Sequence, residues 1–197
     1  MNLGCVVMAS GQSLRFGSNK LMANVLGTPL VLVTALSVTP VYDVVVSTRW
    51  ADVEALCHSN GIACARHEGT VRSQSVRAGL MRGMGRGWDG CLFLPGDQPC
   101  VSITTFNGLA RAFERTGGDR IVRTACDGTA ASPVLFPRRL FCSLLQLQGK
   151  SGGAPVIAAE AGAGRPAVLV EATAAELQDV DTKDDLQKVV AYLSRVS

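Results

Sequence analysis

Short apolar runs recur along the chain, and the stretches between most of them are long enough to form helices. The runs occupy residues 3–9, 42–47, 62–66, 90–94, 119–125 and 167–170. Short runs that are mostly apolar, without a regular alternation of polar positions, are typical of parallel strands covered by helices on both faces. The pattern therefore predicts strands and helices in alternation.

Helix signals fall between these runs. We expect helices at 28–38, 50–60, 73–84, 102–115, 138–147 and 182–193. Thr28 and Pro29 have the chemistry of an N-cap followed by a first helical residue, and Gly61 is a typical helix end. Asp184 and Asp185 in the first turn suit the positive end of the last helix. Four glycines around Trp88 predict a flexible connection.

The alternation predicts one α/β domain over residues 1–197, with a mostly parallel sheet in a Rossmann-like three-layer α/β/α fold. Each crossover is long enough for a right-handed connection. Ligands of such open sheets bind outside the carboxyl ends of the strands. The residues after each strand are therefore the candidates for function.

Composition and charge exclude several classes of protein. The chain is 47% apolar and 18% charged, and its net charge is +3. This scattered charge predicts neither nucleic-acid nor membrane binding, and no apolar run approaches the roughly 18 residues of a membrane span. Seven cysteines without a C-x-x-C pair predict neither disulfides nor a zinc site. We expect buried thiols in a reducing cytoplasm.

The loop after the first strand has the chemistry of a phosphate-binding loop. Residues 10–20 hold three serines, two glycines, Arg15 and Lys20. Small residues let backbone N–H groups approach anionic oxygens, while the two cations supply charge. The spacing fits neither a P-loop nor G-x-G-x-x-G. A solvated surface loop is the alternative.

Three further segments offer polar groups at strand or helix ends. Asp97 follows the strand at 90–94 and is a candidate metal ligand, although Gly-Asp-x-Pro is also ordinary turn chemistry. Ser73 and Ser75 near a helix start suit either a ligand or simple capping. Asp181 suits either a metal or the cap of the last helix.

The first loop resembles that of the MobA-like NTP transferases, which reads L-A-A-G-x-S-x-R-M-G before a Lys and a Leu. The run from Met8 to Gly17 is M-A-S-G-Q-S-L-R-F-G, and Lys20 and Leu21 follow. The resemblance continues in order through S-V-x-x-G-L, D-Q-P and D-x-D-T-x-x-D-L. It implies a fold of the nucleotide-diphospho-sugar transferase type.

The resemblance also implies roles for individual residues. The triphosphate contacts are Ala9, Ser10, Gly11 and Ser13, the base and ribose lie near Ser75 and Gly79, and the catalytic residues are Arg15, Lys20 and Asp97. Arg15 and Lys20 neutralise the pyrophosphate leaving group. Asp97, with Asp181, holds Mg²⁺ or Mn²⁺.

The implied activity is transfer of a nucleoside monophosphate to a phosphorylated acceptor with release of pyrophosphate. The pattern is most similar to the molybdenum cofactor cytidylyltransferases, so CTP is favoured over GTP, molybdopterin is the expected acceptor, and a molybdoenzyme is a possible client. Ser13 adds to the preference for CTP, because guanylyltransferase relatives have a more glycine-rich loop.

Three rival functions stay open at the level of the sequence. They are a guanylyltransferase, a sugar-phosphate or polyol-phosphate cytidylyltransferase suggested by the segment 72–76, and a non-catalytic accessory protein that binds a nucleotide or cofactor for molybdoenzymes. The acceptor segment departs from the family: Lys150 replaces an Asp, Ala154 replaces an Arg, and Ala131 stands where glycine is usual. Acceptor identity is therefore the weakest inference.

Overall fold

A seven-stranded sheet with the order β5-β4-β1-β6-β8-β7-β9 forms the centre of the computed structural model, which describes residues 1–13 and 15–196. Leu14 of the first loop lies outside the described residues. Neighbouring strands are parallel except β8, which is antiparallel to both β6 and β7. The strands are β1 (Leu3–Ala9), β4 (Asp43–Thr48), β5 (Ala63–Arg66), β6 (Gly90–Pro95), β7 (Val122–Cys126), β8 (Thr129–Pro137) and β9 (Val168–Glu171).

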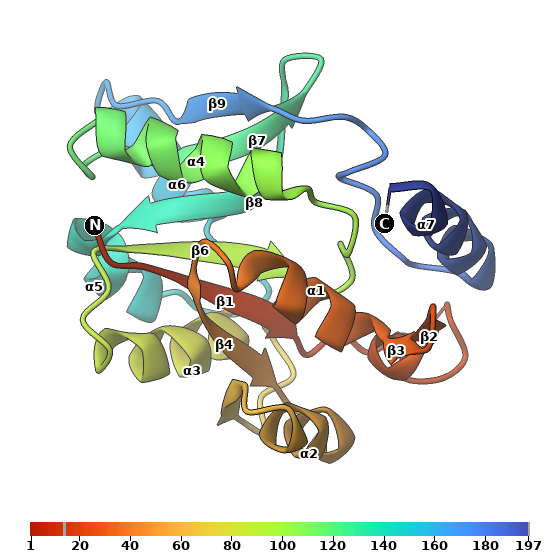
Figure 1. Cartoon of the computed structure of the whole chain (residues 1–197). Helices are drawn as coiled ribbons and strands as arrows, with labels where there is room; N and C mark the ends of the chain where they lie inside the picture. Colours follow the sequence, from red (N-terminus) through yellow and green to blue (C-terminus); the bar gives the residue numbers. More distant parts are fainter. Residues whose placement is uncertain (14, 197) are drawn as a thin grey trace.

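Helices cover both faces of this sheet (Figure 1). One face carries α1 (Leu30–Val38), α2 (Ala51–Ser59) and α4 (Ile103–Arg115), and the other carries α3 (Arg72–Met84), α5 (Phe141–Leu145) and α6 (Ala154–Gly162). The last helix, α7 (Lys183–Val196), packs beyond the carboxyl ends of the central strands, near the small ribbon β2 (Asn24–Val25) and β3 (Thr28–Pro29). The predicted three-layer α/β/α fold is confirmed.

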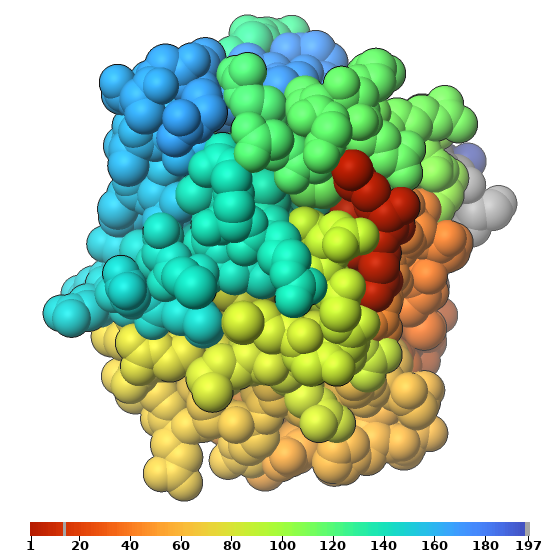
Figure 2. Space-filling view, turned by 90° about the vertical axis from the view of Figure 1, so that its left-hand side faces the viewer, coloured from red at the N-terminus to blue at the C-terminus, as the bar shows by residue number. Residues whose placement is uncertain are grey.

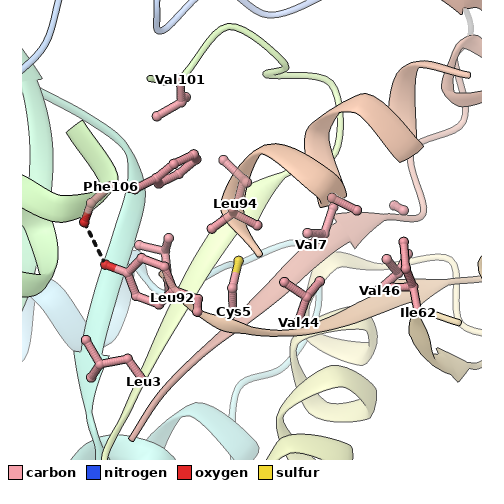
Figure 3. Close-up of a cluster of buried hydrophobic side chains, with 14 of the residues drawn as sticks. Leu3, Cys5, Val7, Val44, Val46, Ile62, Leu92, Leu94, Val101 and Phe106 are labelled. Atoms are coloured by element: carbon pink, nitrogen blue, oxygen red, sulfur yellow. Dashed lines mark hydrogen bonds between the residues drawn. The ribbon is translucent and has the colours of Figure 1, made fainter. Parts of the chain in front are cut away.

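Successive strand residues divide the core into two layers because side chains alternate across a sheet. Cys5 and Val7 of β1 point to the α1 side, where they meet Leu92 and Leu94 of β6 (Figure 3). Val6 points to the α3 side. Burial of such side chains stabilises the fold by about 1.5–3 kcal/mol each. Burial on both faces explains why β1 is an uninterrupted apolar run.

On the face shown in Figure 2, the first residues of the chain, drawn in red, lie beside yellow-green and green segments from the middle of the chain. Asn2 donates through its backbone N–H to Asp89, 2.8 Å away, and through its side chain to the carbonyl of Arg86. Trp88 is fully buried. A Cβ on Gly83 would lie 2.0 Å from the Trp88 ring. Gly83 therefore lies inside α3 and makes room for Trp88, so it is a packing position and not part of the predicted connection, whereas an added Cβ would have room at Gly85 and Gly87.

Several boundaries differ from the prediction. The strand β8 and the helix α6 were not predicted. In β8 the reason is Pro133, because a proline argues against a strand that is paired on both sides. Thr28 pairs with Val25 in β3, so α1 begins at Leu30 and not at Thr28. The expected helix at 138–147 is a 3-10 turn at Arg138–Leu140 followed by the short α5.

The structure also bears on the predicted burial of the cysteines and on membrane-spanning helices. All seven cysteines are free thiols, but Cys142 is exposed and Cys64 and Cys126 are partly exposed, so they are not all buried as expected. Within the described part of the chain, none of the helices is both long and apolar enough to cross a bilayer.

Candidate active site

A cleft of about 1140 Å³ opens at the carboxyl ends of β1 and β6. Its walls come from the first loop, the start of α3, the end of β6, the strands β7 and β8, the helix α6 and the segment before α7. The residues predicted for the site that line it are Ser10, Gly11, Ser13, Arg15, Lys20, Ser75, Asp97 and Asp181. The structure therefore brings most of the predicted site together at the expected edge of the sheet.

The Lys20 ammonium is the centre of a charge cluster in this cleft. It lies 2.6 Å from Asp97 and 2.9 Å from Asp181, and its side chain is only 9% exposed. Arg15 contacts Asp181 from the solvent side at 3.2 Å. Lys20 begins a 3-10 turn (Lys20–Met22) that Asn19 caps by accepting from the N–H of Leu21. This short rigid element aims the ammonium into the cleft.

The charges of the cluster shift one another's pKa values. Burial lowers the pKa of Lys20, but attraction to Asp97 and Asp181 outweighs burial and the net pKa is raised. The hydrogen bond from Lys20 lowers the pKa of Asp181. Burial, and then the charge of Asp97, raises the pKa of Asp179. The cluster thus holds a firmly charged ammonium beside carboxylates of unequal acidity.

Backbone contacts explain why Asp97 and Asp181 meet although they are far apart in sequence. The N–H of Val180 donates to the carbonyl of Asp97 at 3.0 Å, and the side chain of Gln98 donates to the carbonyl of Leu177. These contacts also place Asp179 in the cleft. Sequence reasoning treated Asp179 only as part of a motif, and its position after a loop gave no stronger signal.

The start of α3 is arranged differently from the capping hypothesis. The helix begins at Arg72, so neither Ser73 nor Ser75 is its N-cap. Instead, the hydroxyls of Ser10 and Ser75 lie 2.8 and 3.0 Å from Nε2 of His67. Nδ1 of His67 accepts from the N–H of Gly69, which assigns the ring proton to Nε2. His67 therefore links the first loop to α3.

Sequence reasoning missed this role of His67. Its only signal was a lone imidazole two residues before Gly69, which more often marks an ordinary loop residue. Burial lowers the pKa of His67, and the positive charges of Arg49 and Arg66 lower it further by smaller amounts. The ring is consequently neutral at physiological pH and donates one hydrogen bond toward the two hydroxyls.

Two predicted contact residues lie beneath the cleft and not on its lining. Ala9 is fully buried, and its carbonyl accepts from the hydroxyl of Thr48 at 2.7 Å. A Cβ on Gly79 would lie 2.3 Å from Val6. Gly79 thus permits α3 to pack closely on the sheet. Ala9 and Gly79 are therefore not among the described residues that line the cleft, and their packing contacts account for both positions.

In the segment before α7, different residues cap the helix and face the cleft. The hydroxyl of Thr182 accepts from the N–H of Asp185, and the carboxylate of Asp185 accepts from the N–H of Thr182. This reciprocal pair caps α7, which begins at Lys183. Because Thr182 and Asp185 satisfy the helix end, the side chain of Asp181 points to Lys20 and Arg15.

The acceptor side of the cleft holds cations that were not predicted. Lys150 is exposed and is not among the described residues that line the cleft, whereas Ala154 lines it at the start of α6. Arg72 and Arg123 also line it. Gly152 lies against Arg72, since a Cβ there would be 2.8 Å from the arginine side chain.

The carboxylates of the cluster suit a divalent cation. Among the described residues no group of three or more His, Cys, Asp or Glu side chains is arranged to hold a metal. Asp97 and Asp181 nevertheless converge on one cation, the Lys20 ammonium. Magnesium at nucleotide sites commonly uses one or two carboxylates together with phosphate oxygens. This donor set therefore fits a nucleotide-bound Mg²⁺ or Mn²⁺.

Comparisons with known proteins bear on the family and the fold of this chain. A model of the MobA-like NTP transferase domain matches residues 5–164. The purine catabolism protein PucB of Bacillus subtilis (strain 168) is 28% identical over 96% of each chain. A nucleotidyl transferase from Methanothermobacter thermautotroptrophicus, Mth528, has a TM-score of 0.83 at 21% identity, covering 100% of this chain and 99% of that chain. The manganese complex of Rv0371C from Mycobacterium tuberculosis H37Rv has a TM-score of 0.72 at 22% identity, covering 97% and 99%.

Proposed function

Because this chain belongs to the MobA-like NTP transferase family, we propose that it transfers CMP from CTP to a phosphorylated acceptor and releases pyrophosphate. The observation that carries the proposal is the cluster of Lys20, Asp97 and Asp181 with Arg15 in one cleft. A triphosphate is strongly anionic, and this cluster offers the cations Arg15 and Lys20 beside two carboxylates that suit a metal.

The residues of the chain would act mainly by positioning and by electrostatic stabilisation. The first loop receives the phosphates, with Ser10, Gly11 and Ser13 on the lining. Arg15 and Lys20 neutralise the charge that develops on the pyrophosphate as it leaves. An acceptor phosphate is already anionic and needs no general base before it attacks the α-phosphorus.

Asp97 and Asp181 would hold Mg²⁺ or Mn²⁺, which supplies charge neutralisation between phosphate oxygens. The manganese complex of Rv0371C supports the use of a divalent cation. If Asp97 and Asp181 bind the metal, the Lys20 ammonium would give up part of its contact with these carboxylates and contact a phosphate instead.

For the substrates we propose CTP and molybdopterin, in the cytoplasm, with a molybdoenzyme as client. The support is the order of motifs in the sequence, and Ser13 on the cleft lining. The departures at Lys150 and Ala154 favour a second candidate, an accessory protein that binds a nucleotide or cofactor without turnover. A guanylyltransferase, or a cytidylyltransferase that acts on a sugar phosphate or polyol phosphate, would require the same triphosphate and metal contacts and differ in the base or the acceptor.

Replacement of Asp97 by asparagine tests the catalytic proposal. We expect Asp97→Asn to fold, because Asp97 is partly exposed, and to lose about 100-fold or more of its metal-dependent pyrophosphate release. Asp184→Asn is the matched control, since Asp184 is exposed in the first turn of α7. Unchanged turnover in Asp97→Asn would refute the assignment.

A panel of nucleotides separates the candidate functions. Thermal shifts with CTP, GTP, ATP or UTP and Mg²⁺ report binding to the native state, because bound ligand raises stability by mass action. A shift with CTP alone supports the proposal, and a shift with GTP alone supports a guanylyltransferase. Binding without pyrophosphate release, with any NTP and a phosphorylated pterin, supports the accessory protein.

A further inference from the structure

Arg123 is a cation in the cleft without an acidic partner among residues 1–13 and 15–196. It lies on β7, and its Nε donates to the carbonyl of Ala131 at 3.0 Å. Within those residues no carboxylate lies at ion-pair distance from Arg123. Arg86 and Arg165 on the outer surface have carboxylate partners, whereas the exposed Arg111 has none at ion-pair distance among the described residues. A guanidinium has five N–H donors, so the Nη side of Arg123 has capacity for a ligand.

The surroundings of Arg123 raise the cost of leaving its charge unpaired. The side chain is partly buried, and this burial lowers the pKa of the guanidinium. A charge removed from water without a counter-charge is destabilising. An anion that enters the cleft would offset that cost, and a guanidinium can hold two of its oxygens at once.

The sheet register places apolar side chains beside this cation. Arg123 pairs with Val134 of β8, and Val134 pairs with Phe93 of β6, so all three point to the same face of the sheet. Phe93 packs edge-on against Phe136, with ring centroids 5.8 Å apart. Ile157 of α6 lines the same cleft. The Arg123 end thus combines one cation with apolar walls.

We propose that Arg123 binds the phosphate monoester of the acceptor, whose remaining part lies against Phe93, Val134 and Ile157. The proposal deepens the proposed function and rests on it, because the nucleotide and the acceptor must share one cleft. Two phosphates that approach each other repel, and a cation on the acceptor side reduces that repulsion. Arg123 supplies from β7 the positive charge that Ala154 lacks at the start of α6.

Calorimetric titration with phenyl phosphate and inorganic phosphate tests the subsite directly, without turnover. The protein is saturated with Mg²⁺ and α,β-methylene-CTP, which cannot transfer CMP, and each titration is repeated without nucleotide. We expect Arg123→Met to bind phenyl phosphate at least about tenfold more weakly than wild type and Arg123→Lys to be intermediate, because charge-assisted hydrogen bonds are lost. Binding of α,β-methylene-CTP should change less than about twofold.

Two further variants separate charge from apolar contact. Arg111→Met is the matched control, because Arg111 is exposed on α4 at the opposite face of the sheet, and we expect it to bind as wild type does. Ile157→Ala should weaken phenyl phosphate more than inorganic phosphate, since only the former has a ring to place against the wall. Melting temperatures establish that each variant is folded.

Wild-type affinity for phenyl phosphate in Arg123→Met would overturn the proposal, as would displacement of phenyl phosphate by α,β-methylene-CTP in the wild type. Failure of the proposed function has another signature, namely no binding of α,β-methylene-CTP at all. In that case the titrations without nucleotide still decide whether phosphate binding depends on Arg123.

Discussion

Replacing Lys20 by methionine removes the cation between Asp97 and Asp181 and keeps a side chain of similar length. At an effective dielectric constant of 20, contacts of 2.6 and 2.9 Å each contribute about 6 kcal/mol of gross attraction. Desolvation of the ammonium offsets much of this, because the Lys20 side chain is only 9% exposed. The net effect is therefore far smaller than the gross attraction.

Loss of one partner from a buried ion pair costs about 3–5 kcal/mol, but water reaches both carboxylates of this cluster. The side chains of Asp97 and Asp181 are 21% and 40% exposed. After this screening we expect Lys20→Met to lower the free energy of unfolding by about 1–3 kcal/mol at pH 7. Urea denaturation measures the change, with Lys188→Met, a surface pair at 3.7 Å, as control.

The pH dependence follows from the direction of the pKa shifts. Lys20 lowers the pKa of Asp181, so this part of the stability is present above the ordinary carboxyl pKa of about 4 and is lost as pH falls through the lowered value. The raised pKa of Lys20 contributes stability below about pH 10.5 that disappears as pH rises further. The difference between wild type and Lys20→Met should shrink at both extremes.

The same substitution should have opposite effects on metal affinity and turnover. Without the ammonium, Asp97 and Asp181 are free to bind a cation, so we expect Lys20→Met to bind Mn²⁺ more tightly than wild type in the absence of nucleotide. Pyrophosphate release should fall by about 100-fold or more. Wild-type turnover in Lys20→Met, or weaker Mn²⁺ binding measured by calorimetry, would contradict the reasoning.

Three further predictions concern stability. Asp179→Asn should raise the melting temperature at pH 7 and lose this advantage as pH falls through the raised pKa of Asp179 toward about 4, because that carboxylate is destabilised when it is charged in the folded state; equal melting temperatures at pH 7 would disprove it. His67→Gln should reduce the loss of stability between pH 7.5 and 5 in urea denaturation, since a lowered histidine pKa gives stability that is present above about 6.5 and lost on acidification. Gly83→Ala should lower the free energy of unfolding by about 1–3 kcal/mol through overlap with Trp88, whereas Gly85→Ala, which has room, should not.

Local patterns in the sequence determined much of this protein. Short, mostly apolar runs predicted the parallel strands, and β1 has the predicted bounds because its burial on both faces leaves no polar position in the run. The sequence also predicted the positions of Arg15, Lys20 and Asp97, because a residue that follows a parallel strand lies at the ligand-binding edge of the sheet. The placement of Asp184 and Asp185 in the first turn of α7 was also predicted, because it depends only on neighbouring residues, whereas the reciprocal cap between Thr182 and Asp185 was not.

Only the tertiary structure decided the features that depend on distant segments. The contact between Val180 and Asp97 brings Asp179 to the cluster, and no local signal records that contact. Gly79 lies against Val6, where an added Cβ would overlap, because the packing of α3 on the sheet sets which side of the helix faces β1. Arg123 faces the cleft only because β8 inserts antiparallel between β6 and β7 and fixes the register of their side chains. Sequence determines which groups are present near a strand end, whereas long-range pairing determines which of them meet.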